Sequence, residues 1–321
     1  MAPALPPRES KRAHGPAVYH VYGLRLDSQW RLPYPRRRAP WLAEVSLRQA
    51  SDTEFLRALK HVQLPENGAP WATAMLADGR RYLRWSGVFE FLIDSTGRHV
   101  TCRPLAAQGT SAFHTHLGPS LSFALINLGI EPLHSTSLAI DGRAVALMGD
   151  CGCGKSSLGA SFVRAGYRLL TDDLLVVGRD ADRFIAHPGV PRVKLFPAIA
   201  KVIFGSGVQG LRLEPLTPKL IIPLDERQSQ RTPVPLGAIY VLTPPGKRVP
   251  SRVVIKRLSP RQAFVELVRN TFNMSVNEPG RLERQFALAT QLAMSVPVKS
   301  LSYPRELRML REAREVILKD L

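Results

Sequence analysis

The chain has 321 residues, of which 45% are hydrophobic and 22% charged, so it can bury one large core or two ordinary ones. Its formal net charge of +18 favours partners that carry phosphate groups or other negative charge. No apolar run approaches the roughly 20 residues of a membrane span, and three cysteines are too few for a disulfide framework, so we expect a cytoplasmic protein with no membrane partner.

Residues 1–16 are basic and rich in proline, and they lack the apolar stretch of a secretory signal. We expect a disordered tail there. Arginine is also frequent at residues 36–38 and near the C-terminus. A scattered excess of arginine is typical of solvated surface, so nucleic acid is a less favoured partner than a peptide or protein.

Residues 17–120 are predicted to form an N-terminal α+β domain. The segment 17–33 alternates like a strand, and residues 53–63 have the pattern of a short helix. Residues 80–94 and 99–105 read as two strands joined by a turn at 95–97. A helix over residues 114–128, which ends at a glycine, would bridge to the second part of the chain.

Residues 121–321 are predicted to form a second α/β domain. It opens with two alternating runs on either side of Asp141-Gly142, a strong hairpin signal. A helix follows from Lys155, and a buried strand interrupted by acids spans 167–177. Ser259 before Pro260 predicts the start of another helix. The remaining elements are expected as strands within 183–197, 236–244 and 251–259, a helix at 281–294, a strand at 298–302 and a last helix from about 305.

The segment GDCGCGKS matches the phosphate-binding pattern G-x-x-x-x-G-K-[ST] at every fixed position, and a predicted strand and helix flank it. Glycines let backbone N–H groups converge on phosphate oxygens, and the helix N-terminus adds its positive end. Lys155 is expected to reach the β- and γ-phosphates of ATP and Ser156 to bind Mg²⁺. The expected nucleotide-binding residues are Gly149, Asp150, Cys151, Gly152, Cys153, Gly154, Lys155, Ser156 and Ser157.

Cys151 and Cys153 form a Cys-x-Cys pair inside this loop, and the chain has one other cysteine, Cys102. A thiolate metal site would need further ligands. We interpret the pair as two tolerated loop residues, with a redox-sensitive loop as the alternative.

Asp172 and Asp173 follow Lys155 by 17 and 18 positions. Because successive residues of a strand face opposite ways, the two carboxylates cannot serve the same atom. One could hold Mg²⁺, and the other could accept a proton from an incoming hydroxyl. The alternative is that one of them caps a turn or pairs with an arginine. His134, 21 residues before Lys155, begins the neighbouring strand and could reach the phosphates, although a lone histidine is more often structural.

The stretch LHSTSLAIDGRAVALMGDCGCGKSSLGASFVRAGYRLLTDDLLVV resembles the kinase domain of the HPr kinase/phosphorylase family. It is more closely similar to the stand-alone HPr-kinase-like proteins of bacterial peptide-tailoring clusters, including lasso-peptide kinases. The segments VYHVYGLRLDSQWRLP, YLRWSGVFEFLID and PRVKLFP also resemble these proteins, so the likeness runs through most of the chain from about Val18.

The resemblance implies a compact P-loop fold of the HPr kinase and phosphoenolpyruvate carboxykinase type, with a mixed sheet. It places the catalytic base on Asp172, a catalytic histidine on His134, and a metal ligand on Asp173 together with Ser156. The chain lacks the family's second signature, an Arg-Gly-Leu-Gly-Ile-type stretch, which puts HPr handling and phosphorolysis in doubt. Arg192 and Lys194 stand nearby and could hold a phosphate or a peptide carboxylate, or be surface charges.

The sequence thus predicts a kinase that uses ATP and Mg²⁺ to phosphorylate a hydroxyl, with a serine of a peptide or protein as acceptor. A ribosomal precursor peptide is the acceptor that the resemblance implies. The alternatives are a kinase of a small metabolite or of RNA, and a nucleotide-binding regulatory module without acceptor chemistry. A homo-oligomer is compatible with the sequence. The central expectation is that His134 and Asp172 converge on the terminal phosphate.

Overall fold

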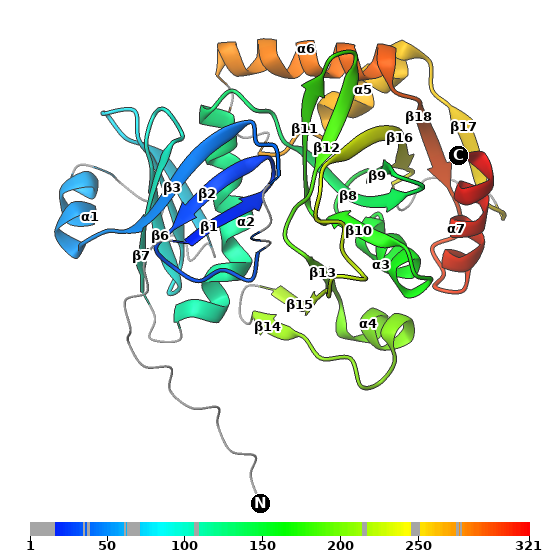
Figure 1. Ribbon diagram of the computed structural model, residues 1–321, viewed down its shortest axis with the longest axis horizontal. Coiled ribbons are helices and arrows are strands. Elements are labelled where there is room, and N and C mark those ends of the chain that lie inside the picture. The colour runs from blue at the N-terminus through cyan, green and yellow to red at the C-terminus, as the bar shows by residue number, and fades with distance from the viewer. Residues whose placement is uncertain are drawn as a thin grey trace, which may run out of the picture.

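The computed structural model describes residues 17–34, 36, 39–60, 62, 71–105, 109–213, 217–244, 251–273, 276 and 278–321, and within them it is a mixed α/β protein with three sheets and seven helices (Figure 1). The expected tail at 1–16 and two of the three arginines at 36–38 lie outside these residues. None of the helices in the described part combines the length and apolar content needed to cross a membrane.

The N-terminal part is a seven-stranded sheet in the order β1-β2-β3-β7-β6-β5-β4. Its strands are β1 (Ala17–Val21), β2 (Leu24–Ser28), β3 (Ala43–Gln49), β4 (Trp71–Met75), β5 (Arg81–Trp85), β6 (Phe89–Ile93) and β7 (His99–Pro104). The helix α1 (Asp52–Leu59) begins where the Ser51 side chain accepts a hydrogen bond from the backbone N–H of Glu54. The expected helix and the turn at 95–97 are both found.

Two stretches that we predicted as single strands are hairpins instead. The segment 17–33 turns back at Tyr22-Gly23, where both residues have positive φ, so β1 pairs antiparallel with β2. The segment 80–94 turns at Gly87, also with positive φ, between β5 and β6. Tight hairpin turns need such left-handed conformations, and without an Asn-Gly or Asp-Gly pair the alternating pattern alone did not indicate them.

The helix α2 (Gly109–Asn127) connects the two parts of the chain and lies between their sheets (Figure 1). It contacts β6 and β7 on one side and β11 (Leu174–Asp180) on the other. Its residues Leu117 and Leu121 share one hydrophobic core with the N-terminal sheet and with Leu174 and Val176 of β11. The boundary expected at residue 120 therefore falls inside a helix that packs on both sides.

The second part is built on an eight-stranded sheet. The strands run in the order β10-β8-β11-β12-β16-β18-β17, and β9 pairs with both β8 and β16. β16 is parallel to β9 and β18, whereas the other pairs are antiparallel, so the sheet is mixed, as expected. The strands are β8 (Leu133–Ile140), β9 (Arg143–Met148), β10 (Arg168–Thr171), β11, β12 (Arg183–His187), β16 (Val234–Leu242), β17 (Val254–Arg257) and β18 (Val298–Ser302).

Helices cover both faces of this sheet. α3 (Lys155–Arg164), α4 (Pro197–Phe204) and α7 (Met309–Asp320) share a core with Val145 and Leu147 of β9. α5 (Pro260–Arg269) and α6 (Pro279–Ser295) pack on the other face, against Ala146 and Met148. Because both faces are buried, β9 reads as a continuous apolar run.

α5 begins after Ser259, as expected, and Gln262 completes a capping box with Ser259. α7 begins at Met309, a few residues after the expected start. We did not predict α4 or most of a small three-stranded sheet in the order β13-β15-β14. Its strands are β13 (Arg192–Leu195), β14 (Leu211–Leu213) and β15 (Thr217–Pro223).

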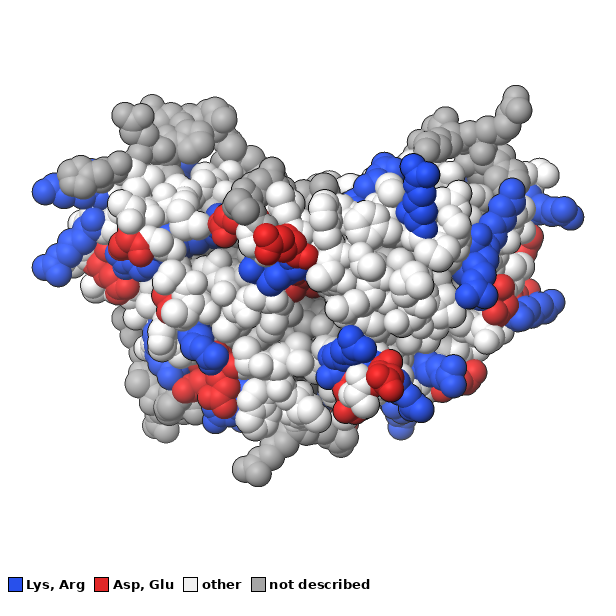
Figure 2. All heavy atoms as spheres, turned by 90° about the horizontal axis from the view of Figure 1, so that it is seen from above, with Lys and Arg blue, Asp and Glu red and all other residues white. Residues whose placement is uncertain are grey.

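The face that carries α6 has no continuous basic stripe (Figure 2). Lysine and arginine side chains stand in separate groups on this face, and several of them lie next to aspartate or glutamate. The excess of positive charge is therefore dispersed over this face, as expected for solvated arginines.

A buried ion pair ties α6 to the segment that precedes β8. Arg281 is fully buried and donates to the Glu131 carboxylate at 3.0 Å. Its guanidinium also donates to the backbone carbonyl groups of Phe272, Asn273 and Val276 at 2.5, 2.6 and 2.9 Å. The Arg281 side chain thus fixes the backbone of the segment that follows α5.

We expect Arg281→Met to lower the free energy of unfolding by about 3–5 kcal/mol, because it leaves the buried Glu131 carboxylate and several carbonyl groups without their donor. Urea denaturation measures the change. Arg284→Met is the matched control, since Arg284 binds the same carboxylate at 3.1 Å but its side chain is 38% exposed. It should cost under about 1 kcal/mol. Equal losses in the two variants would contradict this account of the ion pair.

Candidate active site

The glycine loop lies between β9 and α3, as its sequence pattern predicts. Gly149 has φ +133°, and a Cβ there would lie 2.8 Å from the backbone oxygen of Leu242, so the position requires glycine. Gly154 precedes α3 with φ +84°. Since β9 lies between β8 and β16, the loop emerges from inside the sheet, and neighbouring strands can supply side chains on both sides of it.

Lys155 is nearly buried and reaches back across its own loop. Its ammonium group donates to the backbone oxygens of Gly149 and Asp150 at 2.6 and 3.1 Å. Burial lowers the pKa of Lys155, and neighbouring acidic groups oppose that effect. The loop therefore holds a cation at the N-terminus of α3, which is where a P-loop binds phosphate.

Asn270, the C-cap residue of α5, anchors this loop from the side. Its side-chain oxygen accepts from the backbone N–H of Gly149 at 2.8 Å, and its own backbone oxygen accepts from the N–H of His134 at 2.7 Å. One residue thus links the loop to the start of β8. We did not identify it from sequence, because an asparagine at the end of a helix has no motif that relates it to a loop 121 residues earlier.

The two adjacent aspartates do not lie within one strand. β10 ends at Thr171 and β11 begins at Leu174, and both strands pair with β8. Asp173 has φ +75°, which turns the chain between them. The segment 167–177 is thus interrupted at its acids, as expected, but a left-handed residue rather than the alternation of strand faces separates the two carboxylates.

Asp172 is buried beneath the loop and binds the first turn of α3. Its Oδ1 accepts from the hydroxyl groups of Thr136 and Ser156 at 2.6 and 2.9 Å, and its Oδ2 accepts from the backbone N–H of Lys194 at 3.0 Å. Burial and the charge of Asp173 raise the pKa of Asp172, against the effect of these hydrogen bonds. The carboxylate is therefore fixed against Ser156.

Asp173 faces the opposite way, into a cavity. Its side chain is 30% exposed and pairs with the Lys194 ammonium at 2.5 Å. Burial alone would raise the pKa of Asp173, but the charge and hydrogen bond of Lys194, assisted by His134 and Arg192, hold it well below its usual range. Asp173 thus stays ionised at neutral pH.

His134 stands beside this carboxylate. It is the second residue of β8 and lies opposite Leu174, the residue after Asp173, and its ring meets Phe272 edge to face at 5.7 Å between centroids. Burial, and then the positive charge of Lys155, lower the pKa of His134 from 6.5 to about 4. The imidazole is therefore neutral at physiological pH, and it can donate one hydrogen bond and accept another without carrying charge.

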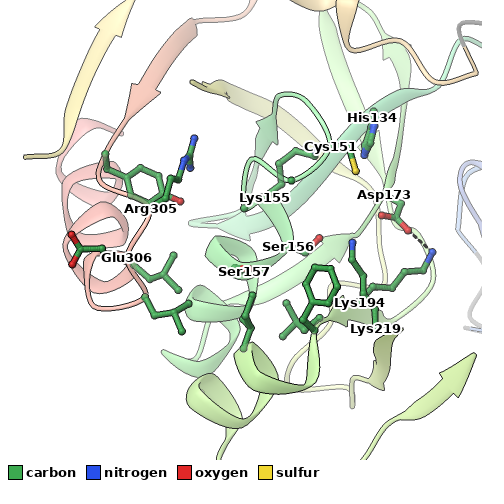
Figure 3. A pocket seen from close by; sticks show the side chains of 18 residues that line it. His134, Cys151, Lys155, Ser156, Ser157, Asp173, Lys194, Lys219, Arg305 and Glu306 are labelled. Carbon is green, nitrogen blue, oxygen red and sulfur yellow. Dashed lines mark ion pairs between the residues drawn. The ribbon is translucent and has the colours of Figure 1, made fainter. Parts of the chain in front are cut away.

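A cavity of about 370 Å³ lies between the phosphate loop, with Lys155, and the side chains of His134 and Asp173 (Figure 3). At one end lie His134, Asp173 and Lys194, and the other end is formed by the segment that leads into α7. Its lining comprises His134, Cys151, Gly152, Gly154, Lys155, Ser156, Ser157, Asp173, Lys194, Leu195, Phe196, Ile199, Lys219, Tyr303, Arg305, Glu306, Leu307 and Leu310.

Some residues expected in the site lie elsewhere. Arg192 is 8% exposed and does not line the cavity, whereas Lys194, two residues later in β13, does. Cys153 is buried in the core beneath the loop, whereas Cys151 is exposed and faces the cavity. Gly149 and Asp150 line a smaller pocket on the far side of the loop.

The structure brings His134 together with Asp173 in the cavity, whereas Asp172, the expected base, lies below them. Sequence reasoning also missed Lys219, Tyr303 and Arg305. These come from β15 and from the chain before α7, far from the loop in sequence, and no spacing pattern relates them to it.

The donor set at Ser156 and Asp172 fits Mg²⁺, because a hydroxyl and a carboxylate oxygen lie 2.9 Å apart at the edge of the loop. Among the residues that the structure describes, no group of three or more His, Cys, Asp or Glu side chains could hold a metal ion. A magnesium site does not need such a group, because the ion takes one or two protein ligands and completes its shell with water and substrate phosphates.

No protein-family model and no curated protein matches this sequence. Among solved structures, the fold is similar to the Hpr(Ser) kinase/phosphatase from Coxiella burnetii. The two chains are 14% identical and align with a TM-score of 0.33 over 59% of this chain and 97% of the other. A likeness of this size does not assign the chain to a family, so its activity has to be argued from the site.

We expect the His134 ring to titrate near pH 4 by NMR. Because the pKa of His134 in the folded state lies below the ordinary 6.5, its neutral ring contributes fully to the free energy of unfolding above pH 6.5. That contribution is lost as the pH falls toward 4. His134→Gln should therefore remove part of the loss of stability at low pH. Lys155→Met should raise the pKa of His134, because it removes a nearby positive charge.

His187 is the control for this measurement. Burial alone lowers its pKa to about 4, so Lys155→Met should leave its titration unchanged. A His134 midpoint near 6.5, or equal shifts of both rings, would contradict the electrostatics described for the site.

Proposed function

We propose that this protein is a kinase that uses ATP and Mg²⁺ to phosphorylate a hydroxyl group, with a serine of a peptide or protein as the acceptor. The observation that carries the proposal is the single cavity in which a P-loop with Lys155 and Ser156 meets an ionised carboxylate, Asp173, and a neutral imidazole, His134. Phosphoryl transfer to an alcohol needs both halves of this arrangement.

The loop and the first turn of α3 would hold the triphosphate. Gly152, Gly154 and Ser156 of the loop line the cavity, and Lys155 would turn from its loop carbonyls to the β- and γ-phosphates. Ser156 and Asp172 would hold Mg²⁺, which neutralises charge on the phosphates when bound.

These contacts lead us to exchange the roles that the resemblance implies for the two aspartates. Asp172 accepts a hydrogen bond from the Ser156 hydroxyl and does not line the cavity, so it would reach a metal ion bound at Ser156 but not the acceptor hydroxyl. Asp173 faces the cavity, which suits the group that orients the acceptor hydroxyl and takes its proton. Because the transition state of phosphoryl transfer is loose, correct orientation contributes more than strong basicity.

Lys194 ties the two acids together. Its backbone N–H binds Asp172, and its ammonium pairs with Asp173. That cation lines the same cavity as Lys155 and Ser156, so it would stabilise charge on the transferring group. His134, kept neutral by burial, would hydrogen-bond the acceptor or Asp173 without adding charge.

The acceptor end of the cavity carries more positive than negative charge. Lys219 and Lys194 line it, Lys194 is paired with Asp173, and the chain as a whole has a net charge of +18. Such a surface favours an acidic acceptor through charge complementarity. This charge and the resemblance to peptide-tailoring kinases support a peptide, including a ribosomal precursor peptide, as the acceptor class.

We expect the protein with γ-labelled ATP and Mg²⁺ to label a pool of acidic serine peptides, with phosphoserine identified by mass spectrometry. Asp173→Asn should lower kcat by roughly 10²–10⁴-fold, with the Kd for ATP changed little, because it removes the proton acceptor and leaves the loop intact. Lys155→Met should weaken ATP binding itself.

Asp182→Asn is the matched control, since this exposed carboxylate lies in the turn after β11 and should leave activity unchanged. Separate pools of metabolites and RNA test the other acceptors. Label found in RNA alone would exclude the peptide acceptor. ATP binding without any phosphorylated product would indicate a regulatory module and contradict the kinase proposal.

A further inference from the structure

The two ends of the cavity differ in chemistry, and this inference rests on the proposed kinase function. One end carries the titratable groups His134, Asp173 and Lys194, and Figure 3 shows them on the side of the loop opposite to Arg305 and Glu306. The second end is built from the segment before α7 and from that helix's first turn. The transfer mechanism proposed above assigns no role to the residues of this second end.

The polarity of a P-loop decides which end receives the nucleoside. The lysine of the loop reaches the β- and γ-phosphates, and the backbone of the loop cradles the α- and β-phosphates. The γ-phosphate must face Asp173 for transfer to occur. The α-phosphate and the nucleoside then run past Gly154 and Ser157 toward the α7 end.

Arg305 stands where the α-phosphate would lie. Its Nη2 donates to the backbone oxygen of Thr243, and its guanidinium stacks on the Tyr303 ring at 4.7 Å from the centroid. Nε and Nη1 have no hydrogen-bond partner within the part of the chain that the structure describes. A Cβ built on Gly154 would lie 3.8 Å from Nη1, so these donors stand beside the phosphate loop.

Apolar side chains continue the cavity beyond Arg305. Leu307 is 39% exposed, Leu310 is buried, and Ile199 of α4 completes this wall. A planar base can pack against such a surface, whereas a phosphate or a charged acceptor would be desolvated there without compensation. The Glu306 carboxylate is paired with Arg308 at 2.5 Å.

We infer that the α7 end of the cavity is the nucleoside subsite: Arg305 donates to the α-phosphate, and the base packs on Leu307 and Leu310. The nucleotide thus lies along the whole cavity, and the acceptor enters from the side of Lys194 and Lys219. Arg305 is a binding residue that fixes the nucleotide's direction, held in place by Tyr303 and Thr243.

Calorimetric titration of the full chain with Mg-ATP and with Mg-tripolyphosphate, which lacks the nucleoside, tests this assignment. Leu307→Ser should weaken ATP binding about fivefold and leave the Kd for tripolyphosphate within about twofold, because it removes only apolar contact. Arg305→Gln should weaken both ligands by roughly tenfold or more, because it removes a charge-assisted hydrogen bond to phosphate.

Arg311→Gln is the matched control, an 80% exposed arginine on the same helix whose partner is Glu315. It should change neither Kd. Thermal melting checks that each variant is folded, and Arg305→Lys replaces Arg305→Gln if the latter is not. Arg305→Lys should keep part of the phosphate affinity, since it retains the charge but not the planar donor group.

The inference is overturned if Leu307→Ser leaves the Kd for ATP unchanged, or weakens tripolyphosphate equally. It is also overturned if the folded Arg305 variant binds both ligands as tightly as the unaltered protein. These results leave the proposed function standing. Conversely, the expected pattern of Kd values without any transfer product would support the subsite and contradict the kinase. An unaltered protein that binds neither ligand would refute both.

Discussion

Two carboxylates that are adjacent in sequence stand next to a cationic phosphate loop, and the way they are kept apart decides what the site can do. Asp172 is buried and accepts hydrogen bonds from the hydroxyl groups of Thr136 and Ser156 and from the backbone N–H of Lys194. Asp173 is turned away by its left-handed backbone and held by the Lys194 ammonium. Two like charges in a buried place would otherwise repel, and one of them would take up a proton. Lys194 prevents this for the carboxylate that faces the cavity.

The strand pairing around β8 makes this arrangement possible. β8 pairs with β9, which leads into the loop, and also with β10 and β11, which flank the two aspartates. His134 near the start of β8 therefore lies next to Asp173. Asn270 then binds Gly149 and His134 together, and the buried Arg281 holds the chain that follows Asn270. The site is thus supported by an ion pair on the opposite side of the sheet.

The cavity combines a polar, charged end with an apolar one, and the phosphate loop lies between them (Figure 3). A triphosphate with a nucleoside has the same order of chemistry along its length. One end has the ionised carboxylate, the neutral imidazole and two lysines, while the α7 end has the stacked guanidinium and the leucines. In the proposed function, the acceptor hydroxyl and the base would therefore bind in separate places, and selectivity for each could vary independently.

The sequence by itself determined the phosphate loop, its flanking strand and helix, the hairpin at Asp141-Gly142 and the cap of α5, because these depend on local backbone requirements within a few residues. It also indicated that two acids and one histidine belong to the same site. Only the tertiary structure decided which acid faces the cavity, since that depends on the φ angle of Asp173 and on Lys194. It alone brought Asn270, Lys219 and Arg305 to the loop, because contacts between distant segments follow from strand order and helix packing, which no local pattern encodes.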